Sequence, residues 1–227
     1  MLQKQFGNYM SELNQLLLEL NHKINFNEHD YYISKSNYYA YNIIDKWPKW
    51  EKKILNIFGE KFSGKTHLAN IFKSKTKALI IDANDINNEI FKKIKLFDNI
   101  IIDNFEKNYD EKLIYSIFNL IDQDNKYMLI NSLVPINEIQ FELPDLISRS
   151  KNCLSAKIES PDDDLIFAII LKNFSDRQIK IEKKIIEFII NRIDRSYSKI
   201  YEFIYKIDEL SLKKKKPINL KTIKEIL

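Results

Sequence analysis

The sequence has 227 residues, of which 44% are hydrophobic, and its formal net charge is +4. This length and apolar content allow one large domain or one domain with a small second lobe, and they exclude wholesale disorder. The sequence holds no apolar run long enough to span a membrane and no signal peptide, and its single cysteine, Cys153, excludes an intrachain disulfide, so a cytoplasmic protein is expected.

The first patterned segment is ELNQLLLELN, residues 12–21, in which half of the residues are leucine. Spacings of three and four place most of the apolar side chains in and before this segment on one helical face. The residues on that face are Phe6, Tyr9, Leu13, Leu16, Leu17 and Leu20. Leu18 does not fit the face, but the periodicity as a whole favours a helix.

Short apolar runs that resemble buried strands alternate with amphipathic stretches in the next part of the chain. The strand-like runs lie at 54–58, 78–82, 99–103 and 127–131, and the amphipathic stretches at 65–74, 84–96 and 110–123. This alternation predicts an α/β domain over residues 22–160, with a parallel sheet covered by helices.

From Pro161 onward the patterns are helical only, which predicts a small all-helical domain over residues 161–227. The acidic cluster Asp162–Asp164 suits the N-terminus of its first helix, where carboxylates meet the positive end of the helix dipole. The basic run at 212–217 fits a solvated helix end before a proline better than a nucleic-acid site.

The segment after the run at 54–58 has the spacing of a phosphate-binding loop: Gly59, four further residues, Gly64, Lys65 and Thr66, followed by a helical pattern. In such a loop backbone N–H groups surround the phosphates, the lysine reaches the β- and γ-phosphates, and the threonine holds Mg²⁺. Two of the three glycines of the chain stand at the required positions. The residues predicted to bind ADP or ATP with magnesium are Gly59, Ser63, Gly64, Lys65, Thr66 and His67, and a structural role on the following helix is the alternative for His67.

Polar residues at the ends of two later strand runs complete the predicted site. Asp103 ends the run at 99–103 and is expected to bind Mg²⁺ together with Thr66. Asn131 ends the run at 127–131, where an amide can contact the γ-phosphate or the attacking water; a turn residue is the alternative. The residue after Asp103 is Asn104, a poor general base, and Glu106 stands two residues further on. The chain's own hydrolysis is therefore expected to be slow.

Several of these segments together resemble the DnaA-related AAA+ proteins, and more closely the Hda family in its alphaproteobacterial form. The similar segments are YYISKSNYYAYNIIDKWPKW at 31–50, GKTHLA at 64–69, IIIDN at 100–104, LPDLISRS at 143–150 and the helical tail. The resemblance implies an AAA+ P-loop lobe followed by a helical lid, with Tyr32, Ile33 and Asn37 at the adenine of the nucleotide. Plain core packing is the alternative for Tyr32 and Ile33.

In LPDLISRS, the resemblance implies that Arg149 is an arginine finger. Its guanidinium would offset charge at the γ-phosphate of ATP held by a neighbouring molecule. An ion pair with Asp145 on its own surface is the alternative.

The chain also departs from the family. Ser198 stands where a sensor arginine of the lid is usual, with Lys199 and Arg195 as the nearby cations, and residues 133–135 lack the family's Asp-Arg pair before the proline. The missing sensor arginine adds to the expectation of slow hydrolysis by this chain.

The resemblance further implies a regulator that binds the DNA polymerase sliding clamp and DnaA, stimulates hydrolysis of the ATP bound to DnaA, and prevents re-initiation of replication. Read as an extended peptide, residues 1–21 contain a Gln-Leu-x-Leu-x-Leu sequence similar to the family's clamp-binding motif. The residues of this motif are Gln15, Leu16, Leu18 and Leu20. The resemblance leaves the oligomeric state undetermined, with a homo-oligomer such as a dimer as one outcome. Direct sequence-specific DNA binding is not expected.

Three other functions fit this sequence less well. The main alternative is a DNA-remodelling or helicase-loader-type AAA+ ATPase, which Asn104 disfavours. A small nucleotide kinase needs an arginine-rich lid, and this sequence has only the arginines Arg149, Arg177, Arg192 and Arg195. A GTPase needs Asn-Lys-x-Asp, and NKYM at 125–128 lacks the aspartate.

Overall fold

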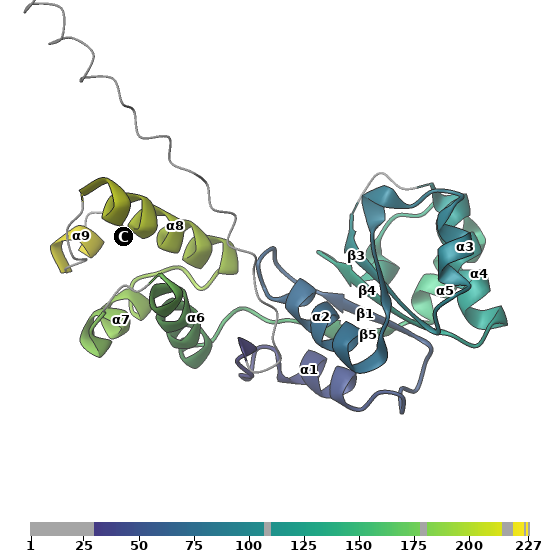
Figure 1. Cartoon of the computed structure of the whole chain (residues 1–227), viewed down its shortest axis with the longest axis horizontal. Helices are drawn as coiled ribbons and strands as arrows, with labels where there is room; N and C mark the ends of the chain where they lie inside the picture. The colour runs from purple at the N-terminus through teal and green to yellow at the C-terminus, as the bar shows by residue number, and fades with distance from the viewer. Residues whose placement is uncertain (1–29, 107–109, 178–180, 215–219, 225, 227) are drawn as a thin grey trace, which may run out of the picture.

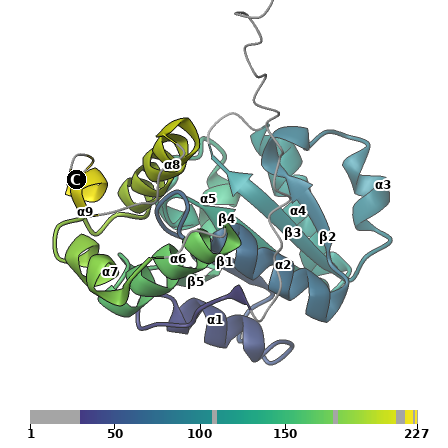
Figure 2. The same cartoon turned by 60° about the vertical axis from the view of Figure 1, so that its left-hand side comes forward.

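Figure 1 shows the computed structural model of the chain, which describes residues 30–106, 110–177, 181–214, 220–224 and 226. The elements up to residue 157 form an α/β lobe, and the elements after residue 162 form a helical lobe beside it, as Figure 2 shows from a second side. The predicted domain boundaries at 22–160 and 161–227 remain predictions. The segment 12–21, with Gln15, Leu16, Leu18 and Leu20, lies outside the described residues.

A five-stranded parallel sheet in the order β2-β3-β4-β1-β5 forms the centre of the α/β lobe. Its strands are β1 (Ile54–Phe58), β2 (Leu79–Asp82), β3 (Asn99–Phe105), β4 (Tyr127–Ser132) and β5 (Leu154–Lys157). The four strand-like runs of the sequence are confirmed, since strands buried on both faces read as continuous apolar runs. β5 was not predicted, because this short edge strand buries only Ala156.

Helices cover both faces of the sheet. α1 (Tyr38–Asp45) and α2 (Lys65–Thr76) pack on one face, and α3 (Ile90–Ile94), α4 (Glu111–Gln123) and α5 (Pro144–Lys151) pack on the other. The helix predictions at 65–74 and 110–123 are confirmed, whereas α1 and α5 were not predicted as helices. An apolar cluster fills each interface between the sheet and its helices. Because the strands are parallel, the loops that follow them meet at one end of the sheet.

The prediction of one amphipathic helix over 84–96 is wrong, because only α3 is α-helical there. Polar side chains ahead of it bind nearby backbone groups instead. The carboxylate of Asp82 accepts a hydrogen bond from the backbone N–H of Asn84 at 3.0 Å, and the Asn87 amide oxygen accepts one from Glu89 at 2.9 Å. Such local bonds compete with helix formation.

The helical lobe comprises α6 (Asp163–Asp176), α7 (Lys183–Ile190), α8 (Tyr197–Lys214) and α9 (Leu220–Lys224), each near a helical pattern of the sequence. It has an apolar core of its own. The buried residues of this core are Ile166, Ile170, Phe174, Ile186, Ile189, Ile200, Phe203, Ile204, Ile207 and Ile223. Within the part of the chain that the structure describes, no helix is long and apolar enough to cross a membrane.

Asp162 joins the two lobes at the N-terminus of α6. Its carboxylate accepts hydrogen bonds from the backbone N–H of Leu165 at 2.8 Å and from the Ser36 hydroxyl at 3.0 Å, just before α1. Partial burial acts to raise the pKa of the Asp162 carboxyl, but the hydrogen bonds from Leu165, Ser34 and Ser36 outweigh it, and the pKa lies below its ordinary value. The predicted carboxylate at this helix N-terminus is therefore confirmed.

Asp162→Ala should lower the free energy of unfolding by about 1–2 kcal/mol, because α6 loses its cap and its tie to Ser36. Since the pKa is lowered in the folded protein, this contribution is present above about pH 4 and is lost as the pH falls through the folded-state pKa. Urea unfolding at pH 7 and at pH 3 measures both effects, with Asp164→Ala, an exposed neighbour, as the control. Equal losses in the two variants would contradict the assignment.

Candidate functional site

The loop between β1 and α2 approaches other parts of the chain so closely that two of its positions require glycine. Gly59 has a φ of +155°, and a Cβ there would lie 2.9 Å from the backbone oxygen of Ile158. Gly64 has a φ of +93°, and a Cβ there would lie 3.2 Å from the ring of Tyr31. α2 begins directly after Gly64, so its free backbone N–H groups and the positive end of its dipole face this loop.

Asp103 connects the loop to the sheet. Its carboxylate accepts hydrogen bonds from the Thr66 hydroxyl at 2.9 Å, from the Asn131 amide at 3.0 Å and from the backbone N–H of Asn104 at 3.0 Å. The pairing of β3 with β4 shifts register between Ile102 and Phe105, and such a bulge re-aims side chains. The structure thus brings together Thr66, Asp103 and Asn131, as their positions at strand ends predict.

The polar groups of the loop fit the phosphates of a nucleotide with magnesium. Lys65 donates hydrogen bonds to the backbone oxygens of Gly59 and Glu60, both at 2.8 Å. Among the described residues, the buried Ser63 hydroxyl and the Asn131 side-chain oxygen have no hydrogen-bond partner. Buried polar atoms rarely stay unpaired, so both are available to a ligand or water. Thr66 and Asp103 present the oxygen ligands that Mg²⁺ prefers beside phosphate.

Burial lowers the pKa of Lys65, and the carboxylates of Asp103, Glu106 and Glu60 partly offset this effect. The lysine is thus desolvated and surrounded by negative charge even before phosphates are considered. Glu106 lies two residues beyond the usual position of a catalytic carboxylate in the sequence. Its side chain nevertheless lines the cavity at the loop.

This cavity has a volume of about 500 Å³ and lies between the phosphate loop and the helical lobe. One wall is the polar loop from Lys61 to His67. The opposite wall is largely apolar and comes from α6 and α8; its residues are Ile169, Asn173, Tyr197, Ile200, Tyr201 and Ile204. A polar wall for phosphates that faces an apolar wall for a base suits a nucleotide.

Asn104 and the two cations near Ser198 make contacts with other side chains. Asn104 has a φ of +56°, and its amide donates to the Asp82 carboxylate at 2.6 Å, on the neighbouring strand. Arg195 pairs with Asp163 at 2.6 Å. Lys199 likewise pairs with Glu202, so neither cation lines the cavity.

Tyr32, Ile33 and Asn37 do not line this cavity. The Asn37 side chain accepts from the backbone N–H of Ser34 at 2.8 Å and donates to the backbone oxygen of Tyr32 at 2.9 Å, which closes the turn before α1. Tyr32 and Ile33 are left exposed, beside α6. The aromatic residue that reaches the loop is Tyr31, whose ring packs on Gly64 and makes an edge contact with His67.

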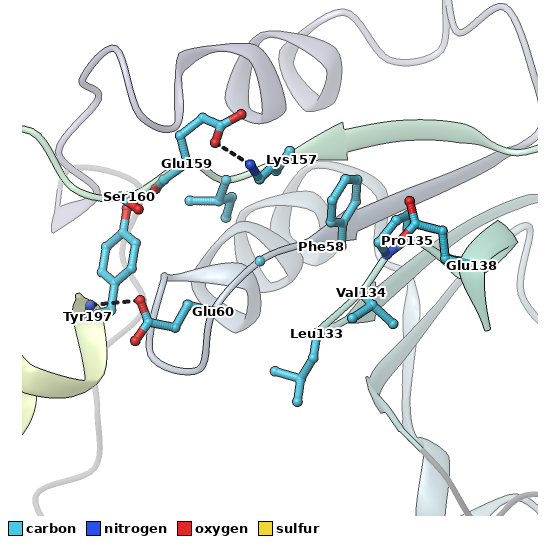
Figure 3. A pocket seen from close by; sticks show the side chains of 12 residues that line it. Phe58, Glu60, Leu133, Val134, Pro135, Glu138, Lys157, Glu159, Ser160 and Tyr197 are labelled. Atoms are coloured by element: carbon cyan, nitrogen blue, oxygen red, sulfur yellow. Dashed lines mark hydrogen bonds and ion pairs between the residues drawn. The ribbon is translucent and has the colours of Figure 1, made fainter. Parts of the chain in front are cut away.

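Sequence reasoning also missed two loop residues whose side chains contact the helical lobe. Figure 3 shows the Glu60 carboxylate directed at Tyr197, at the start of α8, in a second cavity of about 520 Å³. The ring of Phe62 stacks on Tyr201. No pattern in the sequence signals either contact, because both join residues more than a hundred positions apart.

Arg149 lies near the N-terminal ends of the strands, at the opposite end of the sheet from the phosphate loop. It pairs with Asp122 at the end of α4, not with Asp145, and its guanidinium lies 5.6 Å from the centre of the Tyr115 ring. The cavity beside it includes Lys52 and Lys53, which precede β1, whereas the phosphate loop follows β1. Since β1 has five residues, the two ends of this strand are about 17 Å apart. Arg149 therefore faces away from the phosphate loop of its own chain.

A family model described as the Hda lid domain matches residues 162–227. The chromosomal replication initiator protein DnaA of Chlorobaculum tepidum is 28% identical in an alignment of 176 positions, which covers 67% of this chain and 36% of that protein. DnaA of Borreliella afzelii is 26% identical in an alignment of 190 positions, which covers 72% of this chain and 39% of that protein. The chain thus spans well under half the length of these relatives.

Solved structures of similar fold include domain III of the Thermotoga maritima replication initiation protein DnaA, with a TM-score of 0.70 and 17% identity over 89% of this chain and 95% of that chain. AMPPCP-bound DnaA from Aquifex aeolicus has a TM-score of 0.64 at 19% identity, over 81% of this chain and 65% of that chain. At these identities the likeness is one of fold, and it confirms the predicted phosphate-loop α/β lobe with a helical lid.

Asp103→Asn should weaken nucleotide binding in the presence of Mg²⁺ and leave it unchanged in EDTA, because the substitution removes the charge that the metal needs but keeps the size of the side chain. A loss of about tenfold or more is expected, since even outer-shell partners of a metal contribute that much. Titration with a fluorescent ADP measures both conditions. Asp82→Asn, on the neighbouring strand, is the control, and an equal loss in EDTA would contradict a magnesium role.

Proposed function

Because the chain is an AAA+ protein related to Hda and DnaA, we propose that it is a nucleotide-binding regulator of DnaA. In this proposal it stimulates hydrolysis of the ATP bound to DnaA and so prevents re-initiation of chromosome replication. The observation that carries the proposal is the position of Arg149, at the edge of the sheet opposite to the phosphate loop of its own chain. A guanidinium in that position is suited to the phosphates of a neighbouring molecule.

Arg149 would act by stabilising the charge that develops on the transferred phosphoryl group. Its planar fork of N–H donors matches phosphate oxygens in pairs, which an ammonium cannot do. The ion pair with Asp122 and the contact with the Tyr115 ring hold the guanidinium at the surface, with about a third of its side chain exposed. Docking on DnaA would then exchange the Asp122 carboxylate for phosphate oxygens.

The chain's own site would bind ADP or ATP with magnesium chiefly as a structural ligand. Bound Mg²⁺ would neutralise phosphate charge, while Lys65, Thr66 and Asp103 orient the phosphates. The Asn104 amide is bonded to Asp82, and neither Arg195 nor Lys199 lines the cavity, which supports slow hydrolysis. A helicase-loader-type or DNA-remodelling ATPase, which depends on turnover at its own site, is less consistent with these contacts.

Two further partners belong to the proposal. The residues Gln15, Leu16, Leu18 and Leu20 would bind the polymerase sliding clamp as an extended peptide, which brings the chain to sites of replication. A second copy of the chain could meet the first head to tail, with Arg149 of one at the phosphate loop of the other.

Arg149→Ala should reduce stimulated hydrolysis of DnaA-bound ATP by about a thousandfold, because an arginine finger supplies at least that factor. Nucleotide and clamp binding by the variant should stay intact. Release of labelled phosphate from DnaA preloaded with ATP measures the effect. Lys151→Ala, an exposed cation in the same last turn of α5, is the control, and unchanged stimulation in Arg149→Ala would remove the finger assignment.

Leu17→Ala and Leu18→Ala separate the two interpretations of the N-terminal segment. An extended peptide places Leu18 in a pocket of the clamp and Leu17 outside it, so only Leu18→Ala should weaken clamp binding, by about tenfold or more. If the segment is a packed helix, Leu17→Ala should instead reduce packing, because Leu17 then lies on the apolar face, and Leu18→Ala should have little effect. Surface plasmon resonance on immobilised clamp measures binding, and thermal melting detects packing loss. Unchanged clamp binding in Leu18→Ala would contradict the extended peptide.

A further inference from the structure

The N-terminus of the lid helix α8 is capped from the other lobe. The Glu60 carboxylate accepts hydrogen bonds from the backbone N–H groups of Tyr197 at 3.0 Å and Ser198 at 3.1 Å, and from the Ser196 hydroxyl. These N–H groups belong to the first turn of the helix and have no partner within it. A carboxylate there also meets the positive end of the helix dipole. Glu60 therefore ties α8 to the phosphate loop by polar contacts.

Phe62 makes a second tie, two residues further along the loop. Its ring stacks on Tyr201 with the ring centres 4.2 Å apart and the planes 3° from parallel. Tyr201 lies one turn after Tyr197, on the same face of α8, so the alternate loop residues 60 and 62 contact successive turns of one helix. Both rings line the cavity between the loop and the lid.

The backbone of Phe62 supports a functional origin for this contact. Its φ is +67°, in the left-handed region that glycine adopts freely and that a bulky side chain strains. Backbone strain of this kind persists where surrounding contacts hold it, and it concentrates at ligand sites. If glycine replaced Phe62, the stack on Tyr201 and the cation–π contact with Lys61 would both be lost.

The same loop residues link the lid to the group that meets the phosphates. The backbone oxygen of Glu60 accepts a hydrogen bond from Lys65 at 2.8 Å, while its side chain holds α8. The α8 residues Tyr197, Ile200 and Tyr201 in turn form part of the apolar wall. The loop and α8 therefore both bound the cavity that would receive the nucleotide.

We propose that Glu60, Phe62 and Tyr201 form a clasp that holds the lid against the phosphate loop and sets how fast nucleotide enters and leaves. The three are positioning residues, since they act through the lid. The inference rests on the proposed nucleotide binding at this loop, and it adds a control over exchange that the phosphate-loop motif does not contain.

Stopped-flow kinetics with fluorescent ADP on the full chain tests the clasp. Phe62→Ala and Tyr201→Ala should each raise both the association and the dissociation rate constant by about two- to tenfold. This range corresponds to the interaction free energy of an aromatic pair. The double variant should exceed neither single variant, because both remove the same contact. Tyr205→Ala, an exposed tyrosine one turn further on α8 that does not line the cavity, should leave both constants unchanged.

The two rate constants distinguish a clasp from direct contact with the base. Rings that only touched the bound nucleotide would slow its departure without hindering its arrival, so a rise in the dissociation rate constant alone would overturn the clasp. Phe62→Gly removes the ring and the backbone strain together, and it should behave kinetically like Phe62→Ala while melting at a higher temperature. This variant keeps the test valid if Phe62→Ala folds poorly.

Glu60→Gln tests the polar half of the clasp. It keeps an acceptor for α8 but removes the charge, so both rate constants should rise, and the difference from the wild type should shrink in high salt. Unchanged constants in the Phe62, Tyr201 and Glu60 variants would overturn the clasp while leaving the nucleotide site in place. Failure of the wild-type chain to bind ADP or ATP at all would overturn both.

Discussion

The buried carboxylate of Asp103 is the contact on which the rest of the site depends. A charge in the interior is unfavourable unless hydrogen bonds surround it, and here those bonds come from α2, from β4 and from the strand's own bulge. Satisfying Asp103 therefore fixes the start of α2 against two strands. The phosphate loop is held at both ends as a result, by β1 before it and by Thr66 after it. Glu60 and Phe62 then join this loop to the helical lobe, in addition to the tie between Asp162 and Ser36.

Much of this arrangement could be predicted from the sequence, because a strand buried on both faces leaves a continuous apolar run and a phosphate loop has a fixed spacing. The ends of parallel strands meet at one edge, so Asp103 and Asn131 could be placed near Thr66 without a structure. β5 could not be predicted in this way, since an edge strand with one buried residue has no apolar run. α3 was predicted too long because side chains such as Asn87 bind the local backbone.

The contacts that sequence reasoning missed are those that join the two lobes. Glu60 and Phe62 occupy loop positions where the phosphate-binding pattern accepts any residue, so the pattern says nothing about what they touch. The expected adenine contacts failed to reach the cavity for a related reason: Asn37 closes a local turn, which directs Tyr32 outward and leaves Tyr31 on the loop. Likewise an ion pair with Asp145 was the alternative to the finger role of Arg149, but the end of α4 brings Asp122 to it.

The placement of Arg149 and the phosphate loop at opposite edges of the sheet gives the molecule a direction. If Arg149 of one molecule meets the phosphate loop of the next, as proposed, such contacts are heterologous, and they extend as a row or close as a ring. An open row has one end that exposes a finger and another that exposes a loop. Under the proposed function, Arg149 would reach only a molecule whose phosphate loop is exposed, which in an open row is the molecule at one end. The proposed stimulation of hydrolysis would therefore start at the terminal molecule of a row.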